Sequence, residues 1–105
     1  MYIQIVNFRL KSINEQDYAK LCDDLAPTFA ALPGLLSKVW LANRETGVYG
    51  GVYMWEDRQA MEAFTKTDLF KAVGAHPDLE GVTSSDFGVL EQPTQVTRGL
   101  VEARV

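Results

Sequence analysis

The segment Pro33–Asp57, PGLLSKVWLANRETGVYGGVYMWED, constrains the fold more than any other part of the chain. Residues 35–43 and 48–56 are rich in apolar, β-branched and aromatic side chains, which favours two strands. The sequence RETG between them is typical of a type I turn closed by a glycine in the left-handed region. The segment therefore predicts a hairpin in which Asn43 pairs with Val48.

This pairing also predicts which side chains share a face of the sheet. Because side chains alternate along a strand, one face carries Leu36, Lys38, Trp40 and Ala42 beside Tyr49, Gly51, Tyr53 and Trp55. Gly51 lies opposite Trp40, and a glycine within a strand indicates that a bulky group approaches it closely. Either Gly51 simply accommodates Trp40, or this face is the floor of an aromatic pocket that contains one cation, Lys38.

The opposite face of the hairpin is also largely apolar. It carries Leu35, Ser37, Val39 and Leu41 beside Val48, Gly50, Val52 and Met54. A sheet face of this kind is stable only when another layer covers it. We expect the helices of the same chain to cover the aromatic face, and a second copy of the protein to cover the aliphatic face.

The segment before the hairpin predicts a strand and a helix. Residues 2–10 have the apolar and aromatic content of a strand. Ser12 or Asn14 is suited to cap the helix that follows, in which apolar residues recur at three- and four-residue steps to about Leu32. Pro27 is expected to bend this helix.

The segment after the hairpin predicts two short helical pieces and a last strand. Asp57 is suited to cap a helix over residues 58–66, and Thr67 a short helical turn. Residues 74–81 are expected to form a loop and residues 82–91 a strand with a bulge at Gly88. The tail, residues 92–105, is polar, and we expect it to pack along an edge.

The order of these elements predicts an α+β, ferredoxin-like βαββαβ fold with a four-stranded antiparallel sheet. Right-handed crossovers place the first and third strands at the centre and the helices on one face. Residues 1–105 are long enough for one domain. Pairing of two such domains sheet to sheet would close a dimeric α+β barrel, so we expect a homodimer.

Composition and charge exclude several classes of function. The net charge is −4, and no basic cluster is present, which argues against nucleic acid or an anionic membrane as a partner. The start of the sequence lacks the features of a signal peptide, and we expect a cytoplasmic protein. Cys22 is the single cysteine and is interpreted as a small core residue. With one histidine as well, we expect no metal site.

No known catalytic signature stands out, and a set of Ser84 or Ser85 with His76 and Asp86 has nothing in the sequence to link it. Lys38, if desolvated among aromatic rings, would hold an anion or act as a base, but a lysine that extends to an acidic side chain is an equally ordinary arrangement.

Three further candidates each have two interpretations. The loop residue His76 either reaches the mouth of the pocket or lies on the surface. Asp86 is either a general base or the partner of a basic side chain. Tyr53 either offers its hydroxyl to a phenolic substrate or serves only in packing.

Several motifs together resemble one known family. These are PGLL at residues 33–36, KVW at residues 38–40, GGVYMW followed by Asp57 at residues 50–57, and EQP-x-QV at residues 91–96. They resemble the family of YdhR-like putative monooxygenases across essentially the whole chain. The resemblance implies a dimeric α+β barrel of the antibiotic biosynthesis monooxygenase type. This group includes small monooxygenases that use no metal, flavin or haem, haem-degrading enzymes and polyketide cyclases.

The resemblance implies a cofactor-independent monooxygenase that oxidises an aromatic or polyketide-like small molecule with dioxygen in a cleft between helices and sheet. The expected catalytic residues are Lys38, Tyr53 and His76. The expected substrate-binding residues are Trp40, Gly51, Trp55, Phe64 and Phe70. Many relatives place a histidine on or just after the second helix, where this chain has Thr67 and Phe70, so a role for His76 is a departure from the family pattern.

Two other functions are compatible with the same scaffold. One is a non-oxidative cyclase, isomerase or small-molecule binding protein. The other is a haem-binding or haem-degrading barrel, which His76 alone would have to serve.

Overall fold

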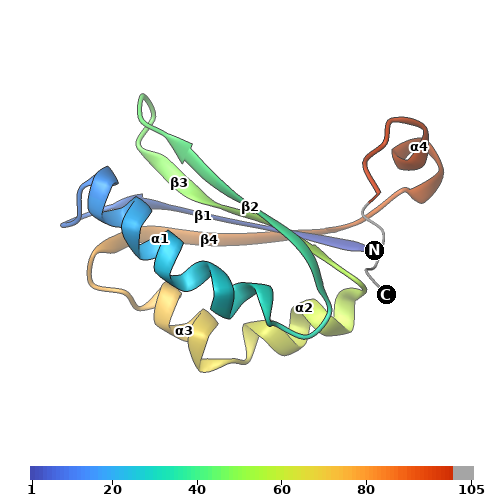
Figure 1. The fold of residues 1–105 in the computed structure, drawn as a ribbon, viewed down its shortest axis with the longest axis horizontal. Coiled ribbons are helices and arrows are strands. Elements are labelled where there is room, and N and C mark those ends of the chain that lie inside the picture. Colours follow the sequence, from blue (N-terminus) through green and yellow to red (C-terminus); the bar gives the residue numbers. More distant parts are fainter. Residues whose placement is uncertain (101–105) are drawn as a thin grey trace.

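A single antiparallel sheet with helices on one face forms the body of the molecule (Figure 1). The structure is a computed structural model of the chain and describes residues 1–100. Its elements are β1 (Tyr2–Leu10), α1 (Glu15–Ala30), β2 (Leu35–Asn43), β3 (Val48–Trp55), α2 (Arg58–Thr65), α3 (Asp68–Gly74), β4 (Leu79–Gly88) and α4 (Glu91–Val96). The strand order β2-β3-β1-β4 places β1 and β3 at the centre, which confirms the predicted ferredoxin-like topology.

The helices α1, α2 and α3 begin where the sequence provides capping side chains. Asn14 accepts a hydrogen bond from the Asp17 amide at 2.8 Å at the start of α1. Asp57 caps α2 in the same way, and the Thr67 hydroxyl caps α3. Each cap gives a partner to an amide that the helix itself leaves free. α1 continues past Pro27 but ends at Ala30, slightly earlier than predicted.

The hairpin has the predicted turn and most of the predicted pairing. Asn43 pairs with Val48, and the register is maintained to Ser37 opposite Met54. The register then shifts, so that Leu35, and not Leu36 as predicted, lies opposite Trp55. This bulge places Leu35, rather than Leu36, against the hydrophobic core.

Three predictions for the C-terminal third were wrong, the first being the strand over residues 82–91, which runs instead from Leu79 to Gly88. The loop predicted for residues 74–81 is shorter, because α3 includes Gly74 and β4 already begins at Leu79. The bulge predicted at Gly88 is absent there, since Gly88 pairs regularly with Tyr2. The irregularity instead lies between Asn7 and Arg9, opposite the segment around Gly81, whose φ of 63° suits glycine.

The predicted polar tail begins with a short helix. α4 stands away from the helices that cover the sheet and lies beyond its end (Figure 1). Pro93 is its third residue, where the missing amide of proline would have no partner inside the helix. Leu90 and Val96 are exposed on this segment, so the described part of the tail does not pack along a sheet edge as predicted. Residues 101–105 of the predicted tail lie outside the described residues.

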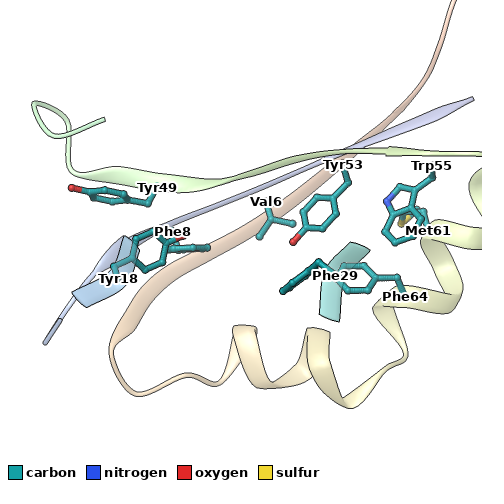
Figure 2. Packing of buried hydrophobic residues seen from close by; sticks show 9 residues of the cluster. All are labelled: Val6, Phe8, Tyr18, Phe29, Tyr49, Tyr53, Trp55, Met61 and Phe64. Atoms are coloured by element: carbon teal, nitrogen blue, oxygen red, sulfur yellow. The ribbon is translucent and has the colours of Figure 1, made fainter. Parts of the chain in front are cut away.

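The core lies between the sheet and the three helices α1, α2 and α3. Its buried side chains are Val6, Phe8, Tyr18, Phe29, Tyr49, Tyr53, Trp55, Met61 and Phe64 (Figure 2). At Gly50, a side-chain carbon would lie 1.8 Å from the carbonyl oxygen of Val6, so only glycine lets β1 and β3 approach in this way. Tyr49, Tyr53 and Trp55 of the aromatic face are among the buried side chains, so this face lies under the helices, as its alternation predicts.

Candidate active site

A cavity of about 290 Å³ lies between the sheet and the helices α1 and α3. Its walls are Phe8, Tyr18, Leu21, Cys22, Leu25, Phe29, Lys38, Trp40, Gly50, Gly51, Tyr53, Leu69, Ala72, Val73, His76 and Leu79. Most of these side chains are aliphatic or aromatic. The cavity therefore provides an apolar environment with very few polar groups, as small-molecule sites commonly do.

Lys38 extends from β2 into a group of aromatic rings that we call the ring cage, formed by Phe29, Trp40 and Tyr53. The Nζ atom lies 3.4 Å from the ring centre of Trp40, 3.5 Å from that of Phe29 and 4.6 Å from that of Tyr53. In the part of the chain that the structure describes, no Asp or Glu lines the cavity. The lysine is therefore held by ring faces in place of an acidic partner.

Two physical effects act on the charge of Lys38 in opposite directions. Burial lowers the pKa of Lys38 from 10.5 to about 7, and the Cys22 sulfur opposes this only weakly. The faces of the ring cage favour the charged form, because aromatic quadrupoles attract cations. The amine can therefore exchange between its neutral and charged forms near neutral pH.

Gly51 leaves the space through which the Lys38 side chain passes. A side-chain carbon at residue 51 would lie 2.9 Å from Cε of Lys38, its nearest neighbour. Trp40 lies opposite Gly51 in the register but packs edge-on against Phe29, with 5.3 Å between ring centres. Of the two interpretations of Gly51, the structure favours a pocket floor beneath the lysine over simple accommodation of Trp40.

Tyr53 places its hydroxyl in the space between sheet and helices (Figure 2). Burial raises its pKa, so the hydroxyl remains protonated. Within residues 1–100, no buried side-chain nitrogen or oxygen that is cut off from solvent lacks a hydrogen-bond partner. Since no protein group in that range bonds to the Tyr53 hydroxyl or to Lys38 Nζ, both atoms keep access to the cavity.

His76 lines the cavity from the segment between α3 and β4. Its Nδ1 accepts a hydrogen bond from the Asp78 amide at 3.1 Å. In the neutral imidazole the proton must then reside on Nε2, which makes that nitrogen a hydrogen-bond donor. The structure thus brings Lys38, Tyr53 and His76 to one cavity together with Trp40 and Gly51.

The other three predicted substrate-binding residues lie behind the cavity wall. Trp55 stacks on Tyr53 with 5.9 Å between ring centres, Phe64 packs against Trp55 at 5.2 Å, and Phe70 against Phe64 at 5.2 Å. The Trp55 indole donates to the fully buried Gln4 at 3.2 Å. None of the three is part of the cavity lining: Trp55 and Phe64 pack against the ring of Tyr53, and Phe70 packs against Phe64.

The remaining polar candidates lie elsewhere. Asp86 is exposed and accepts a hydrogen bond from the Tyr2 hydroxyl, and Ser84 accepts one from Gln4. Asp86, Ser84 and the alternative serine, Ser85, do not line the cavity with His76, so the structure does not assemble a Ser-His-Asp set. In residues 1–100 no three potential metal ligands gather. Over the same residues, the helices are too short or too polar to cross a membrane.

Much of the cavity wall comes from α1, whose residues the sequence does not single out as a site. Tyr18, Leu21, Cys22, Leu25 and Phe29 form the apolar stripe of this helix. The stripe itself is visible as an amphipathic pattern, but that pattern does not distinguish a cavity wall from a filled core. Cys22 is only half-buried and lines the cavity, and burial raises the pKa of its thiol.

An outer groove runs along the other side of α1, between this helix and the hairpin. Its volume is about 480 Å³, and Glu15 and Tyr49 lie along it. Tyr18, Cys22 and Trp40 line both the groove and the cavity. These three side chains form a shared wall and separate the cavity from the edge of the sheet.

Several solved structures have a similar fold. A putative antibiotic biosynthesis monooxygenase from Deinococcus radiodurans has a TM-score of 0.71 and 15% identity, covering 87% of this chain and 94% of its own. The heme-degrader MhuD from Mycobacterium tuberculosis has a TM-score of 0.69 and 20% identity, covering 86% and 96%. A variant of SnoaB, a cofactor-independent oxygenase from Streptomyces nogalater, has a TM-score of 0.64 and 18% identity, covering 87% and 95%. At these identities the likeness is one of fold.

The sequence itself gives the closer assignment. No curated protein matches it. Residues 3–100, which include every strand and helix that the structure describes except the start of β1, match the family described as "Putative mono-oxygenase ydhR". The chain therefore belongs to the ydhR family of putative mono-oxygenases.

Proposed function

We propose that the protein is a cofactor-independent monooxygenase that oxidises an aromatic or polyketide-like small molecule with dioxygen in the cavity between helices and sheet. The main support is Lys38, an amine held among aromatic rings at the wall of an apolar cavity. Membership of the ydhR family supports the oxygenase class. The fold shared with SnoaB, itself a cofactor-independent oxygenase, is compatible with this chemistry.

The first step assigned to Lys38 is removal of a proton from the substrate. With a pKa of about 7, much of the amine is neutral near neutral pH and can accept a proton from a phenol or enol. The ammonium so formed is attracted by the new anion and by the ring cage. Since Tyr53 remains protonated, its hydroxyl can donate a hydrogen bond to the same oxygen.

In the second step the anion transfers one electron to dioxygen. The substrate radical and superoxide combine through a new carbon–oxygen bond, and the proton that Lys38 accepted in the first step completes a hydroperoxide. Loss of water from this hydroperoxide leaves a carbonyl, so one oxygen atom enters the product and the other leaves as water. The apolar wall limits access of water to these reactive species.

The lining of the cavity supports a division of roles among the residues in this proposal. Trp40, Gly51 and His76 share the cavity with the amine, so they are assigned to substrate binding or proton donation. Trp55 and Phe64 pack against the ring of Tyr53, Phe70 packs against Phe64, and all three are assigned as positioning residues. A second copy of the chain on the aliphatic face of the sheet belongs to the same proposal.

Oxygen uptake with a panel of anthrones and hydroquinones tests the proposal. We expect uptake with at least one of them, and a loss of about 100-fold or more in Lys38→Ala, which removes the base. Tyr53→Phe is expected to retain the fold and lose part of the rate. Lys20→Ala, at an exposed position of α1, is the matched control and should react as the wild type does.

Other outcomes would contradict the oxygenase assignment. Tight binding of these compounds without oxygen uptake would favour a non-oxidative cyclase, isomerase or binding protein. A shift of the Soret band on titration with haem, with oxygen uptake only in its presence, would favour a haem protein. Equal uptake by the wild type and Lys38→Ala would remove Lys38 from the mechanism.

A further inference from the structure

The environment of Lys38 is unusual for a lysine that an enzyme uses only as a charge. A lysine that serves as a fixed cation is generally paired with a carboxylate or exposed to water. Lys38 is only partly exposed and its Nζ lies over the ring cage, and within the described residues no acidic side chain lines the cavity. Its environment therefore resembles that of amines that react as nucleophiles.

We propose that Lys38 is a carbonyl-capturing residue that forms a reversible imine with a small aromatic or unsaturated aldehyde bound in the cavity. This activity does not require dioxygen, and it goes beyond the proposed oxidation while using the same amine. The cavity of about 290 Å³ is at the lower end of the range of ligand sites, which favours a compound of one or two rings.

The chemistry balances with the groups that the cavity provides. The lone pair of Nζ adds to the carbonyl carbon, and the carbonyl oxygen takes up a proton to give a carbinolamine. Loss of the nitrogen proton and departure of water then form the carbon–nitrogen double bond. Tyr53 and the Nε2–H of His76 line the same cavity and are the available proton donors to the departing oxygen. No oxidant or reductant is needed.

Two features favour addition and retention of the product. The nucleophile must be neutral, and burial favours the neutral form of this amine. Once formed, the protonated imine is again a cation, and it would lie where the ring cage attracts one. Gly51 contributes to both the addition and the retention of the product, because it leaves the space in which Cε of Lys38 lies.

Reductive trapping tests the proposal directly. The full chain is incubated near pH 7 with 2-naphthaldehyde and cyanoborohydride, which reduces an imine to a stable amine, and the adduct is located by peptide mass spectrometry. A lysine with a pKa of about 7 has roughly a thousand times more neutral amine at this pH than one at 10.5, so one adduct per chain at Lys38 is expected before any surface lysine reacts. The N-terminal amine of Met1 is mapped separately.

Variants separate the reaction from loss of structure. Lys38→Arg retains the charge without a reactive amine and should abolish the adduct, whereas the exposed Lys20→Arg should not change it. Gly51→Ala should slow trapping about 10-fold or more by displacing Cε. Its control, Gly74→Ala, adds a carbon in open space and should trap at the wild-type rate. Circular dichroism confirms that each variant folds.

The dependence on pH gives a second criterion. The trapping rate at Lys38 should rise up to about pH 7 and then level off, while that of surface lysines continues to rise toward about pH 10. Adducts spread evenly over surface lysines, or a Lys38 rate that rises to pH 10, would overturn the proposal. If Lys38 is trapped but no substrate causes oxygen uptake, imine formation stands and only the oxygenase assignment is contradicted. If a substrate causes oxygen uptake but Lys38 is not trapped, the oxygenase assignment stands and only imine formation is contradicted.

Discussion

At the scale of single residues, Lys38 has an energetic consequence that is separate from any reaction. Burial disfavours its charged form, so a protonated Lys38 destabilises the folded state. The protein keeps an amine at a position where a purely structural core would have an apolar side chain. A cost of this kind is typical of residues that serve function rather than stability.

We therefore expect Lys38→Met to be more stable than the wild type at neutral pH. The folded pKa is about 7 and the unfolded value 10.5, so the unfolded chain binds more protons between these values, and wild-type stability rises with pH across this window. The gain is expected to be roughly 2 kcal/mol at pH 7 after a discount for partial exposure, and to shrink toward pH 10. Urea unfolding of both proteins at several pH values measures it.

Lys20→Met provides the comparison for this measurement. Lys20 is exposed on α1, so its replacement should change the free energy of unfolding little at any pH. A stability difference between Lys38→Met and the wild type that stays constant from pH 7 to about pH 10 would show that Lys38 is not desolvated in solution.

The sequence predicts the place of Lys38 but not its surroundings. Alternation places Lys38 and Tyr53 on the face beneath the helices, and both lie there. It does not predict that Phe29 of α1 would supply a ring of the cage, because the packing of a helix on a sheet depends on contacts between distant segments. Gln4 is a similar case: a glutamine in a strand is fully buried because Trp55 and Ser84 provide its partners.

At the scale of elements, the tip of the hairpin is tied to the start of α1. Glu15 accepts a hydrogen bond from the Tyr49 hydroxyl at 2.9 Å and another from Nε of Arg44 at 2.9 Å. These bonds lower the pKa of Glu15, the Arg44 contribution being the larger. These bonds of Glu15 with Tyr49 and Arg44, which we call the tie, cross the outer groove and hold α1 close to the hairpin.

Glu15→Gln is expected to lower the melting temperature at neutral pH, because it removes the charge that holds Arg44 and weakens the bond from Tyr49. A carboxylate with a lowered pKa stabilises the fold above its unfolded value, 4.5, and loses this effect as the pH falls through the folded value. The difference between variant and wild type should therefore vanish in acid. Thermal melts between neutral pH and about pH 3 measure it.

Glu45→Gln is the matched control for this tie. Glu45 lies in the same hairpin tip, is exposed, and makes no ion pair within the described residues. Its replacement should leave the melting temperature close to that of the wild type. An equal decrease in both variants would indicate a general effect of net charge rather than a specific tie.

The boundaries of the elements show where a local pattern stops being informative. The turn at the tip and the alternation of side chains along the strands determine how β2 pairs with β3 from Asn43 to Ser37. The bulge between Leu35 and Ser37 is not predictable in this way, because both Leu35 and Leu36 suit an apolar position and packing against the core selects one. α4 was missed because its polar composition and Pro93 are equally typical of an irregular tail.

At the scale of the whole molecule, the sheet has two faces with different environments. The helices cover one face, and the cavity lies there (Figure 1). The other face carries the apolar side chains Ile3, Ile5, Val39, Leu41, Val52, Met54 and Phe87. Val39 on β2 is 57% exposed and Phe87 on β4 is 53% exposed, so large apolar side chains are open to solvent at both edges of this face.

We expect this face to be covered by a second copy of the chain. Analytical ultracentrifugation of the wild type should then give twice the chain mass of 11.7 kDa at micromolar concentration. Val39→Lys places a charge within the proposed contact and should give a monomer, because a charge buried without a partner is strongly unfavourable. Val39 is already exposed in the single chain, so this change should not prevent folding of the monomer.

Ala63→Lys makes the same kind of change on the exposed side of α2 and should remain a dimer. A wild type that is monomeric at all concentrations would contradict the expected pairing. The cavity has its side chains on the opposite face and takes only backbone from Gly50, so a folded Val39→Lys monomer should still form the adduct at Lys38. If the monomer folds but loses trapping, the geometry of the ring cage depends on the partner, and the dimer is part of the site.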